Sequence, residues 1–425
     1  MQLVPGAFIS LDIEKPAAGG RMLARHERRV ILVSRTIPGE RVIARVERSA
    51  NGVVYAEAIN IVTPSPDRRE MSGDWRCGGN VLGHIAYPCQ LELKAQIIQD
   101  AFTRIAHLPL SSKPTIVGSP EQGYRMRARL HAQNGRLGFF REGSHELCEP
   151  TATGQLLPTT NAWIAEAQDV LRGERLTGLA GIEIAETMTG DQRACHLELH
   201  AGIDAEKFRG LARGLTGLSA ERTDRPGVTL LTGSTTLTDR IRVDMEQGTE
   251  VQLARDVRAF FQGNRFLLEP LVRRVVSHVP RGPVVDLYAG VGLFGLSCAA
   301  AGAQPVLLVE GDLTSGADLQ RNAAQFGGAA RVERRSVEAF LRSARFAADT
   351  TVIVDPPRAG MTRDAVYGII RAEPDRVIYV SCDVATLARD ARVLVDAKYE
   401  LQEISGMDLF PNTAHIETIA VFARH

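Results

Sequence analysis

The chain has 425 residues, of which 44% are hydrophobic and 24% are charged, and its formal net charge is zero. This composition excludes a disordered chain, and the neutral balance excludes nucleic-acid binding through an overall positive charge, although a local basic face stays possible. The length exceeds one ordinary hydrophobic core and predicts two or three domains.

Residues 1–62 are predicted to form a small β-barrel. Alternating apolar runs, such as Arg29–Val33 and Arg41–Val46, are separated by Pro-Gly and Asn-Gly turns. Short strands at this spacing are typical of a five-stranded barrel of the oligonucleotide-binding kind. The segment is rich in arginine, which is equally compatible with RNA binding and with a solvated β-surface.

Residues 63–255 are predicted to form a β-rich middle domain that follows a linker at Pro64–Pro66. Apolar residues at helical spacing predict a helix over 90–106. This helix could pack either within the middle domain or on the catalytic domain. Strand patterns on either side of Asn134-Gly135 predict a hairpin. No catalytic constellation is visible here, so we expect this domain to bind substrate.

From residue 256 to 425 the pattern alternates between helix and strand, which indicates an α/β domain with a parallel, Rossmann-like sheet. A helix is expected over 264–279 and strands over 283–287 and 305–309. The apolar stretch from 283 to 309 contains Asp286, and a buried strand–loop–helix–strand explains it better than a membrane span.

A glycine motif joins the first two of these strands. Gly290, Gly292 and Gly295 satisfy G-x-G-x-x-G after a strand and before a helix. Glycine lets the backbone approach a ligand closely, and the helix N-terminus offers free N–H groups. Glu310, at the end of the next strand, is placed to bind ribose hydroxyls. Nicotinamide dehydrogenases and S-adenosylmethionine methyltransferases both present this pattern.

Two further motifs favour a methyltransferase. Asp355-Pro-Pro-Arg358 follows a short apolar strand, and Val380-Ser-Cys-Asp383 follows another. Because the carboxyl ends of parallel strands meet at one edge of a sheet, an acid and a thiol are expected beside the glycine loop. A dehydrogenase needs neither group there. Arg358, where an aromatic residue would stack a base, argues against transfer to an exocyclic amine.

Cys382 and Glu417 are the candidate catalytic pair. Cys382 precedes a helix that begins at Val384, with Asp383 as its cap, and a helix N-terminus stabilises a thiolate. The competing interpretation is a buried structural cysteine. Glu417 lies in the alternating strand His415–Phe422, where a solvated glutamate and a catalytic base are both possible.

These blocks together resemble the RNA uracil-5 methyltransferases, the family that makes 5-methyluridine in transfer and ribosomal RNA. The similarity runs nearly from end to end and is strongest over residues 260–422. The matching blocks are Phe261-Gln-Gly-Asn264, Asp286-Leu-Tyr-Ala-Gly-Val-Gly292, Val354-Asp-Pro-Pro-Arg-Ala-Gly360, Tyr379-Val-Ser-Cys-Asp383, Asp408-Leu-Phe-Pro411 and His415-Ile-Glu417.

The resemblance implies an N-terminal TRAM-type barrel, a β-rich middle domain and a C-terminal class I methyltransferase domain. It implies methyl transfer from S-adenosylmethionine to carbon 5 of a uridine in tRNA or rRNA. The family's nucleophile falls on Cys382 and its base on Glu417. Its cofactor contacts fall on Gln262, Tyr288, Glu310 and Asp355, beside Gly290 and Gly292. A family Asn of the glycine loop is replaced by Leu293.

Many family members bind a four-iron four-sulfur cluster through four cysteines. The corresponding positions here hold Met71, Cys77, Asn80 and Thr153, while Cys89 and Cys148 lie nearby but off register. One thiolate cannot hold such a cluster, so we predict that it is absent.

The remaining expectations concern partners and location. Six cysteines without the spacing of a disulfide framework, and no N-terminal signal, indicate a reducing cytoplasm. We expect a monomer that binds RNA, with no DNA and no membrane as partners. The main alternative is a noncatalytic RNA-binding protein with a decayed methyltransferase domain, favoured by Leu293 and the lost cluster. A nicotinamide dehydrogenase is a distant third.

Overall fold

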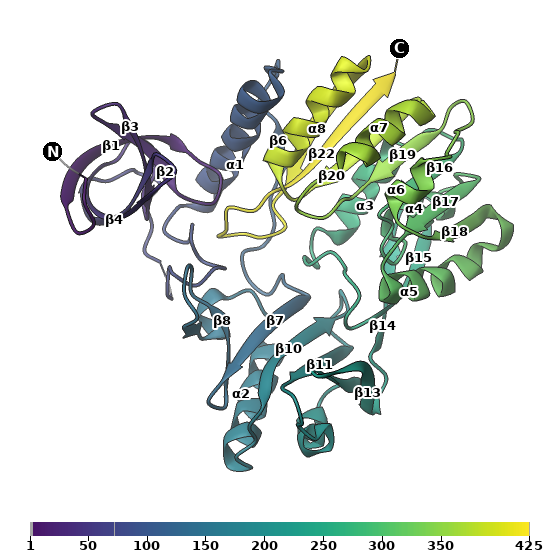
Figure 1. Cartoon of the computed structure of the whole chain (residues 1–425), viewed down its shortest axis with the longest axis horizontal. Helices are drawn as coiled ribbons and strands as arrows, with labels where there is room; N and C mark the ends of the chain where they lie inside the picture. Colours follow the sequence, from purple (N-terminus) through teal and green to yellow (C-terminus); the bar gives the residue numbers. More distant parts are fainter. Residues whose placement is uncertain (1–2, 72, 425) are drawn as a thin grey trace.

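The computed structural model of the chain describes residues 3–71 and 73–424. Figure 1 shows three lobes, namely an N-terminal barrel, a β-rich middle lobe, and an α/β lobe that contains the C-terminus. This arrangement confirms the predicted fold class. Among the described helices, none is long and apolar enough to cross a membrane.

The N-terminal lobe is a closed barrel of five strands in the order β1-β2-β3-β5-β4. In β1, Ile9, Leu11 and Ile13 point into the barrel while the residues between them are exposed, which is the period of two that a strand imposes. The predicted small barrel is therefore confirmed. Its strands are β1 (Phe8–Pro16), β2 (Met22–His26), β3 (Arg29–Ser34), β4 (Arg41–Ala50) and β5 (Val53–Thr63).

The middle lobe contains a seven-stranded sheet in the order β13-β12-β11-β10-β7-β8-β9, with α2 (Pro158–Gly173) packed into its core. The predicted hairpin joins β7 to β8, and Asn134 and Gly135 both have positive φ, 50° and 72°, as a tight hairpin turn requires. The strands are β7 (Arg127–Gln133), β8 (Arg136–Phe140), β9 (Leu147–Cys148), β10 (Leu179–Glu186), β11 (Arg193–Leu199), β12 (Gly217–Arg222) and β13 (Arg225–Gly233).

Three segments within the range predicted for the middle domain pack on the C-terminal lobe, and for the helix this agrees with the prediction. Helix α1 (Tyr87–Ala101) continues as a π-helical turn to Ala106 and buries Ile98 and Phe102 in the core of that lobe. The strand β6 (Thr115–Val117) adds to the edge of its sheet. The ribbon of β14 (Thr236–Arg242) and β15 (Glu250–Asp256) also contributes core side chains there.

The C-terminal sheet has the strand order β18-β17-β16-β19-β20-β22-β21-β6. All neighbours are parallel except β22, which runs antiparallel to β20 and β21. The chain leaves β16 toward β17 and returns on its other side at β19, so the topological switch lies between β16 and β19. The strands are β16 (Val284–Leu287), β17 (Val306–Glu310), β18 (Ala330–Arg334), β19 (Thr351–Val354), β20 (Arg376–Ser381), β21 (Tyr399–Met407) and β22 (Glu417–Arg424).

Helices cover both faces of this sheet and form two separate apolar layers. One layer contains α3 (Leu268–Ser277), α4 (Leu293–Ala300) and α5 (Leu313–Ala323). The other contains α6 (Val337–Leu341), α7 (Arg363–Ala372) and α8 (Val384–Asp396) together with α1. The helix expected over 264–279 is shorter than predicted, because the Asn264 side chain accepts hydrogen bonds from the N–H groups of Phe266 and Leu267 in a turn before α3.

Candidate active site

Three predicted site residues meet at one edge of the C-terminal sheet. Asp355 directly follows β19, Cys382 directly follows β20, and Glu417 is the first residue of β22. The strands adjoin in that order, with Val354 opposite Tyr379 and Ser381 opposite Thr418. Because β22 runs antiparallel to β20 and β21, it begins at the edge where the parallel strands end, and Glu417 is its first residue.

Glu417 is enclosed in this edge, with 3% of its surface exposed. Its Oε1 atom has no hydrogen-bond partner among the described residues. Burial raises the pKa of this carboxyl well above its ordinary value, and the charge of Asp355 adds to the shift while Arg358 opposes it. The alternative of a solvated glutamate is wrong, because β22 lies between β20 and β21 and is buried on both faces.

Cys382 is partly exposed and stands immediately before α8. Asp383 caps that helix as predicted, since its carboxylate accepts a hydrogen bond of 2.9 Å from the backbone N–H of Thr386. Burial, followed by the charges of Glu417 and Asp355, raises the pKa of Cys382 to about 11. The helix terminus was expected to favour the thiolate, but burial and two carboxyl groups outweigh that effect.

The glycine loop between β16 and α4 leaves open space on one side. Gly290 and Gly292 have φ of 56° and 100°, and a Cβ added at Gly290 would meet nothing within 4 Å. The N–H of Gly290 donates over 2.7 Å to Glu310, which ends β17 as predicted. The N–H of Gly295 donates to Asp286 over 2.7 Å, and a Cβ at Gly295 would lie 2.8 Å from that carboxylate. Glycine is therefore required at position 295 by close packing.

Gln262 reaches the same edge from the segment before α3. Its side-chain amide donates to Asp355 over 3.2 Å. Burial raises the pKa of Asp355 to about 7, and the hydrogen bond from Gln262 opposes this shift. Because Leu287 of β16 lies opposite Val354 of β19, Asp355 and the glycine loop leave neighbouring strands at the same edge of the sheet.

The remaining cofactor candidates differ in exposure. Tyr288, with φ of 62°, is partly buried against the layer that contains α7 and α8. Leu293 begins α4 and is 7% exposed in the opposite apolar layer, so packing occupies the position of the family's Asn.

The buried acids of the site fit a cationic ligand, because a positive charge beside them favours their ionised forms. Asp286 is buried, its pKa is raised to about 8 by burial, and its Oδ1 has no hydrogen-bond partner among the described residues. With Asp355 and Glu417 it forms a group of buried acids, and Arg358 is the cation that lowers the pKa of Glu417 and Cys382. A sulfonium beside an open glycine loop fits these acids, so the residues present fit S-adenosylmethionine.

Sequence reasoning missed the residues that hold the segment before Glu417. Lys94 of α1 donates to Asp408 over 2.5 Å, and both side chains are fully buried. Gln90, also from α1, exchanges hydrogen bonds with Asn412. Asp408 belongs to a block matched to the family, but only the tertiary fold shows that α1 is its partner.

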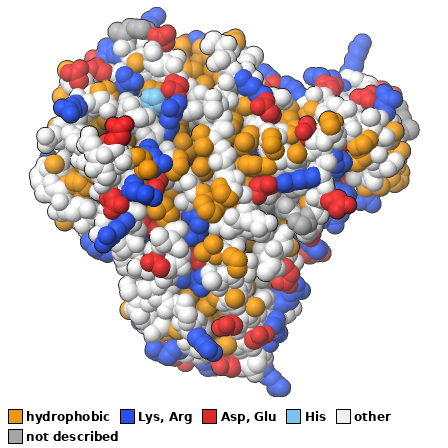
Figure 2. All heavy atoms as spheres, turned by 180° about the vertical axis from the view of Figure 1, so that it is seen from behind, with side chains coloured by type: hydrophobic (Ala, Val, Ile, Leu, Met, Phe, Trp, Pro, Cys, Tyr) orange, Lys and Arg blue, Asp and Glu red, His pale blue; other side chains and the backbone are white. Residues whose placement is uncertain are grey.

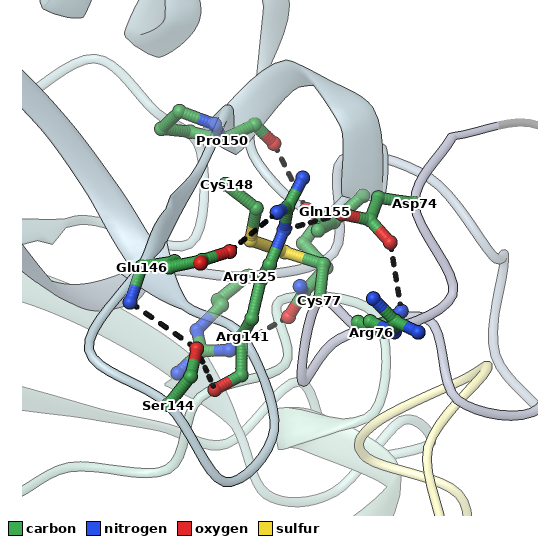
Figure 3. Close-up of a disulfide and its surroundings, with 11 residues drawn as sticks. Asp74, Arg76, Cys77, Arg125, Arg141, Ser144, Glu146, Cys148, Pro150 and Gln155 are labelled. Atoms are coloured by element: carbon green, nitrogen blue, oxygen red, sulfur yellow. Dashed lines mark hydrogen bonds and ion pairs between the residues drawn. A yellow bond between two sulfur atoms is a disulfide. The ribbon is translucent and has the colours of Figure 1, made fainter.

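A disulfide joins Cys77 to Cys148 across 71 positions of sequence (Figure 3). The spacing of the cysteines did not predict it, because β8 and β9 bring Cys148 against the segment that leads from the barrel to α1. Arg141 pairs with Asp74 and Glu146 beside it, each over 2.7 Å. Within residues 3–71 and 73–424, no group of three or more His, Cys, Asp or Glu side chains is placed to hold a metal ion.

Comparison with known proteins places this geometry in a family. The family described as tRNA (Uracil-5-)-methyltransferase matches residues 339–425. A 23S rRNA (uracil(1939)-C(5))-methyltransferase from Pseudomonas putida is 30% identical over 442 residues, covering 99% of this chain and 95% of that protein. An uncharacterized RNA methyltransferase from Thermosynechococcus vestitus is 31% identical over 446 residues, covering 98% of both.

A solved structure shares the whole fold. The crystal structure of the Pyrococcus abyssi tRNA (uracil-54, C5)-methyltransferase in complex with S-adenosyl-L-homocysteine superposes with a TM-score of 0.76. It is 24% identical in sequence and covers 98% of this chain and 100% of that one. The identity and coverage of the relatives, together with this shared fold, show that the chain belongs to the S-adenosylmethionine-dependent RNA uracil-5 methyltransferases.

Proposed function

We propose that the protein methylates carbon 5 of a specific uridine in tRNA or rRNA through a covalent bond between Cys382 and the uracil, which Glu417 resolves as base. The observation that carries this proposal is the meeting of Cys382, Glu417 and Asp355 at the ends of adjoining strands, beside the glycine loop. A thiol, a general base and an acid at a cofactor loop are the groups that this reaction needs.

S-adenosylmethionine, when bound, supplies an electrophilic methyl group. We assign its binding to Gln262, Tyr288, Gly290, Gly292, Glu310 and Asp355. Glu310 already accepts from the loop N–H of Gly290 and is placed for a ribose hydroxyl pair. Gln262 keeps the carboxylate of Asp355 oriented toward the loop edge.

The protein's part in the chemistry is to activate carbon 5 of uracil. The Cys382 sulfur, once deprotonated, adds to carbon 6, and the electron pair of the double bond moves toward carbon 5 and the carbonyl oxygen. Carbon 5 then takes the methyl group, with S-adenosylhomocysteine as the leaving group. Glu417 accepts the hydrogen of carbon 5 as a proton, the double bond re-forms, and the bond from carbon 6 to Cys382 breaks. The base must leave its stack to reach this edge.

The barrel and the middle lobe are proposed to bind the RNA. Arg48 lies over the ring of Tyr55 at 3.7 Å, and Arg35 and Arg76 lie near the ring of Trp75, at 5.4 and 5.2 Å. Arginine and aromatic planes of this kind stack unpaired bases. On the face in Figure 2, basic side chains are mixed with acidic ones over all three lobes, so stacking rather than a broad positive field fits this surface.

We propose the boundaries 1–62, 63–255 and 256–425 for barrel, middle and methyltransferase domains, with α1 packed on the last of these. We also propose a cytoplasmic monomer that binds neither DNA nor membranes. Because Cys77 and Cys148 form a disulfide, the cytoplasmic location is proposed from the RNA substrate of the family and not from the cysteines.

We infer that this protein holds no iron–sulfur cluster. Of the four positions that carry the family's cluster ligands, Met71, Asn80 and Thr153 offer no thiol. The fourth, Cys77, is bonded to Cys148. The donor set therefore does not fit a cluster that needs four thiolates.

Replacing the nucleophile tests the proposal. Cys382→Ala is expected to abolish formation of 5-methyluridine, measured by mass spectrometry of RNA incubated with the full-length protein and S-adenosylmethionine. Cys298→Ala, a buried cysteine in α4, is the control and is expected to remain active. Methylation by Cys382→Ala near the wild-type rate would refute the mechanism.

The same samples distinguish the proposed enzyme from the alternative, a noncatalytic RNA-binding protein. Calorimetry with S-adenosylhomocysteine is expected to show binding to the wild-type protein and to Cys382→Ala alike, whereas a decayed domain would show none.

A further inference from the structure

Arg265 extends from the methyltransferase lobe into the middle lobe. It lies three residues after Gln262 in the sequence, and 8% of its surface is exposed. Its Nε donates to the carbonyl of Gly123 over 2.8 Å, and its Nη1 donates to the carbonyls of Thr187 and Met188 over 3.2 and 2.9 Å. Its Nη2 pairs with the carboxylate of Glu186 over 2.8 Å. One guanidinium thus ties two stretches of the middle lobe together.

Glu186 is as enclosed as its partner. Only 1% of its surface is exposed, and its second oxygen accepts from Nε of Arg193 over 2.7 Å and from the hydroxyl of Thr160. A buried charge is costly to leave unpaired. Removing the Glu186 carboxylate therefore perturbs the buried guanidinium of Arg265 directly.

Two side chains of the segment before Arg265 make contacts at or near the proposed active site. Gln262 donates to Asp355 over 3.2 Å, and Asn264 donates to the carbonyl of Leu409 over 2.9 Å, in the segment that leads to Glu417. The carbonyl of Gly263 accepts from the N–H of Met126 over 2.8 Å, so the same segment is also paired with the middle lobe.

We infer that Arg265, held by Glu186, is a positioning residue through which the middle lobe sets the place of Gln262 at the cofactor edge. The inference rests on the proposed cofactor site. Its physical basis is that Gln262 lies in a loop, and the contacts of Arg265 and Gly263 with the middle lobe fix one end of that loop. Binding of RNA to the middle lobe and binding of cofactor to the methyltransferase lobe are then coupled through the ion pair between Arg265 and Glu186.

Glu186→Gln tests the inference because glutamine keeps the shape of the side chain and removes its charge. In the full-length protein we expect affinity for S-adenosylhomocysteine, measured by calorimetry, to fall about tenfold, because a small misplacement of a binding group is enough for such a loss. We expect kcat to fall with it, while KM for RNA changes little.

Glu40→Gln is the matched control. Glu40 is a fully buried carboxylate in the barrel and accepts two hydrogen bonds of 2.7 Å from Arg68, so its loss costs the same kind of ion pair far from Gln262. We expect a lower melting temperature and unchanged affinity for S-adenosylhomocysteine. Arg265→Lys is the second variant if Glu186→Gln does not fold, because lysine keeps the charge but cannot reach the three carbonyls.

One result would contradict the positioning role of Arg265, and another would contradict the proposed cofactor site. If both folded variants, Glu186→Gln and Arg265→Lys, bind S-adenosylhomocysteine like the wild-type protein, the ion pair only stabilises the fold and the inference is overturned. If instead the wild-type protein does not bind it, or Asp355→Asn binds it equally well, the proposed cofactor site itself is wrong.

Discussion

Cys382 lies opposite Glu417 where β20 ends and β22 begins. Ser381 pairs with Thr418 in the antiparallel ladder, so one further step of the register sets the thiol against the carboxyl group. The pair is close enough for the Glu417 charge to raise the pKa of Cys382. Residues that are distant in sequence therefore share one edge with Asp355, which directly follows the neighbouring strand β19.

Replacing Glu417 with glutamine should trap the reaction after methyl transfer. Glutamine fills the same buried space but cannot accept the proton from carbon 5, so the bond between Cys382 and carbon 6 is not released. We expect a protein–RNA adduct that survives denaturing electrophoresis and contains the methyl group. The double variant with Cys382→Ala should form no adduct, and an adduct in that variant would show that another residue is the nucleophile.

The rate of methyl transfer should rise with pH. Methyl transfer needs the deprotonated sulfur of Cys382, whose pKa is raised to about 11, whereas Glu417 acts only after the transfer. Single-turnover rates are therefore expected to increase from about pH 6 to about pH 9. A rate that falls over this range would contradict these roles.

Arg358 sets where this rise occurs, because its charge lowers the pKa of both Cys382 and Glu417. Arg358→Gln should move the profile to higher pH. Arg392→Gln, which removes an exposed arginine on α8, should leave the profile in place.

Asp355 should lower stability at neutral pH. Its folded pKa of about 7 lies above the ordinary 3.8, so the folded protein keeps a proton that the unfolded chain releases. Its contribution to stability is complete below the unfolded value and is lost as pH rises through the folded value. Asp355→Asn should therefore melt at a higher temperature than wild type at about pH 8, by a few degrees, and at a similar temperature near about pH 4. Asp169→Asn on α2 is an exposed control, and equal gains in both variants would refute the assignment.

The disulfide should stabilise the protein measurably. Closing a loop across 71 positions removes unfolded-state entropy equivalent to about 4 kcal/mol. Reduction, or Cys148→Ser, should lower the melting temperature, while Cys89→Ser should not. Thiol titration of the denatured, unreduced protein should find four free cysteines of the six. Six free thiols and an unchanged melting temperature on reduction would show that the bond does not form.

The sequence determined the local elements because their causes are local. Alternation in the first sixty residues, the Asn134-Gly135 turn, and the glycine loop before α4 each depend on a few neighbouring residues, and each was predicted correctly. Asp355 and Cys382 could be placed on one edge because parallel strands share the direction of their ends.

Only the tertiary structure decided the partners that come from distant segments. The antiparallel insertion of β22 between β20 and β21 buries Glu417, which alternation along that strand could not reveal. The contacts of α1 with Asp408, of Glu186 with Arg265, and of Cys77 with Cys148 each join residues separated by long stretches of chain. Such pairs are selected by how whole lobes pack, and no short pattern in the sequence encodes that packing.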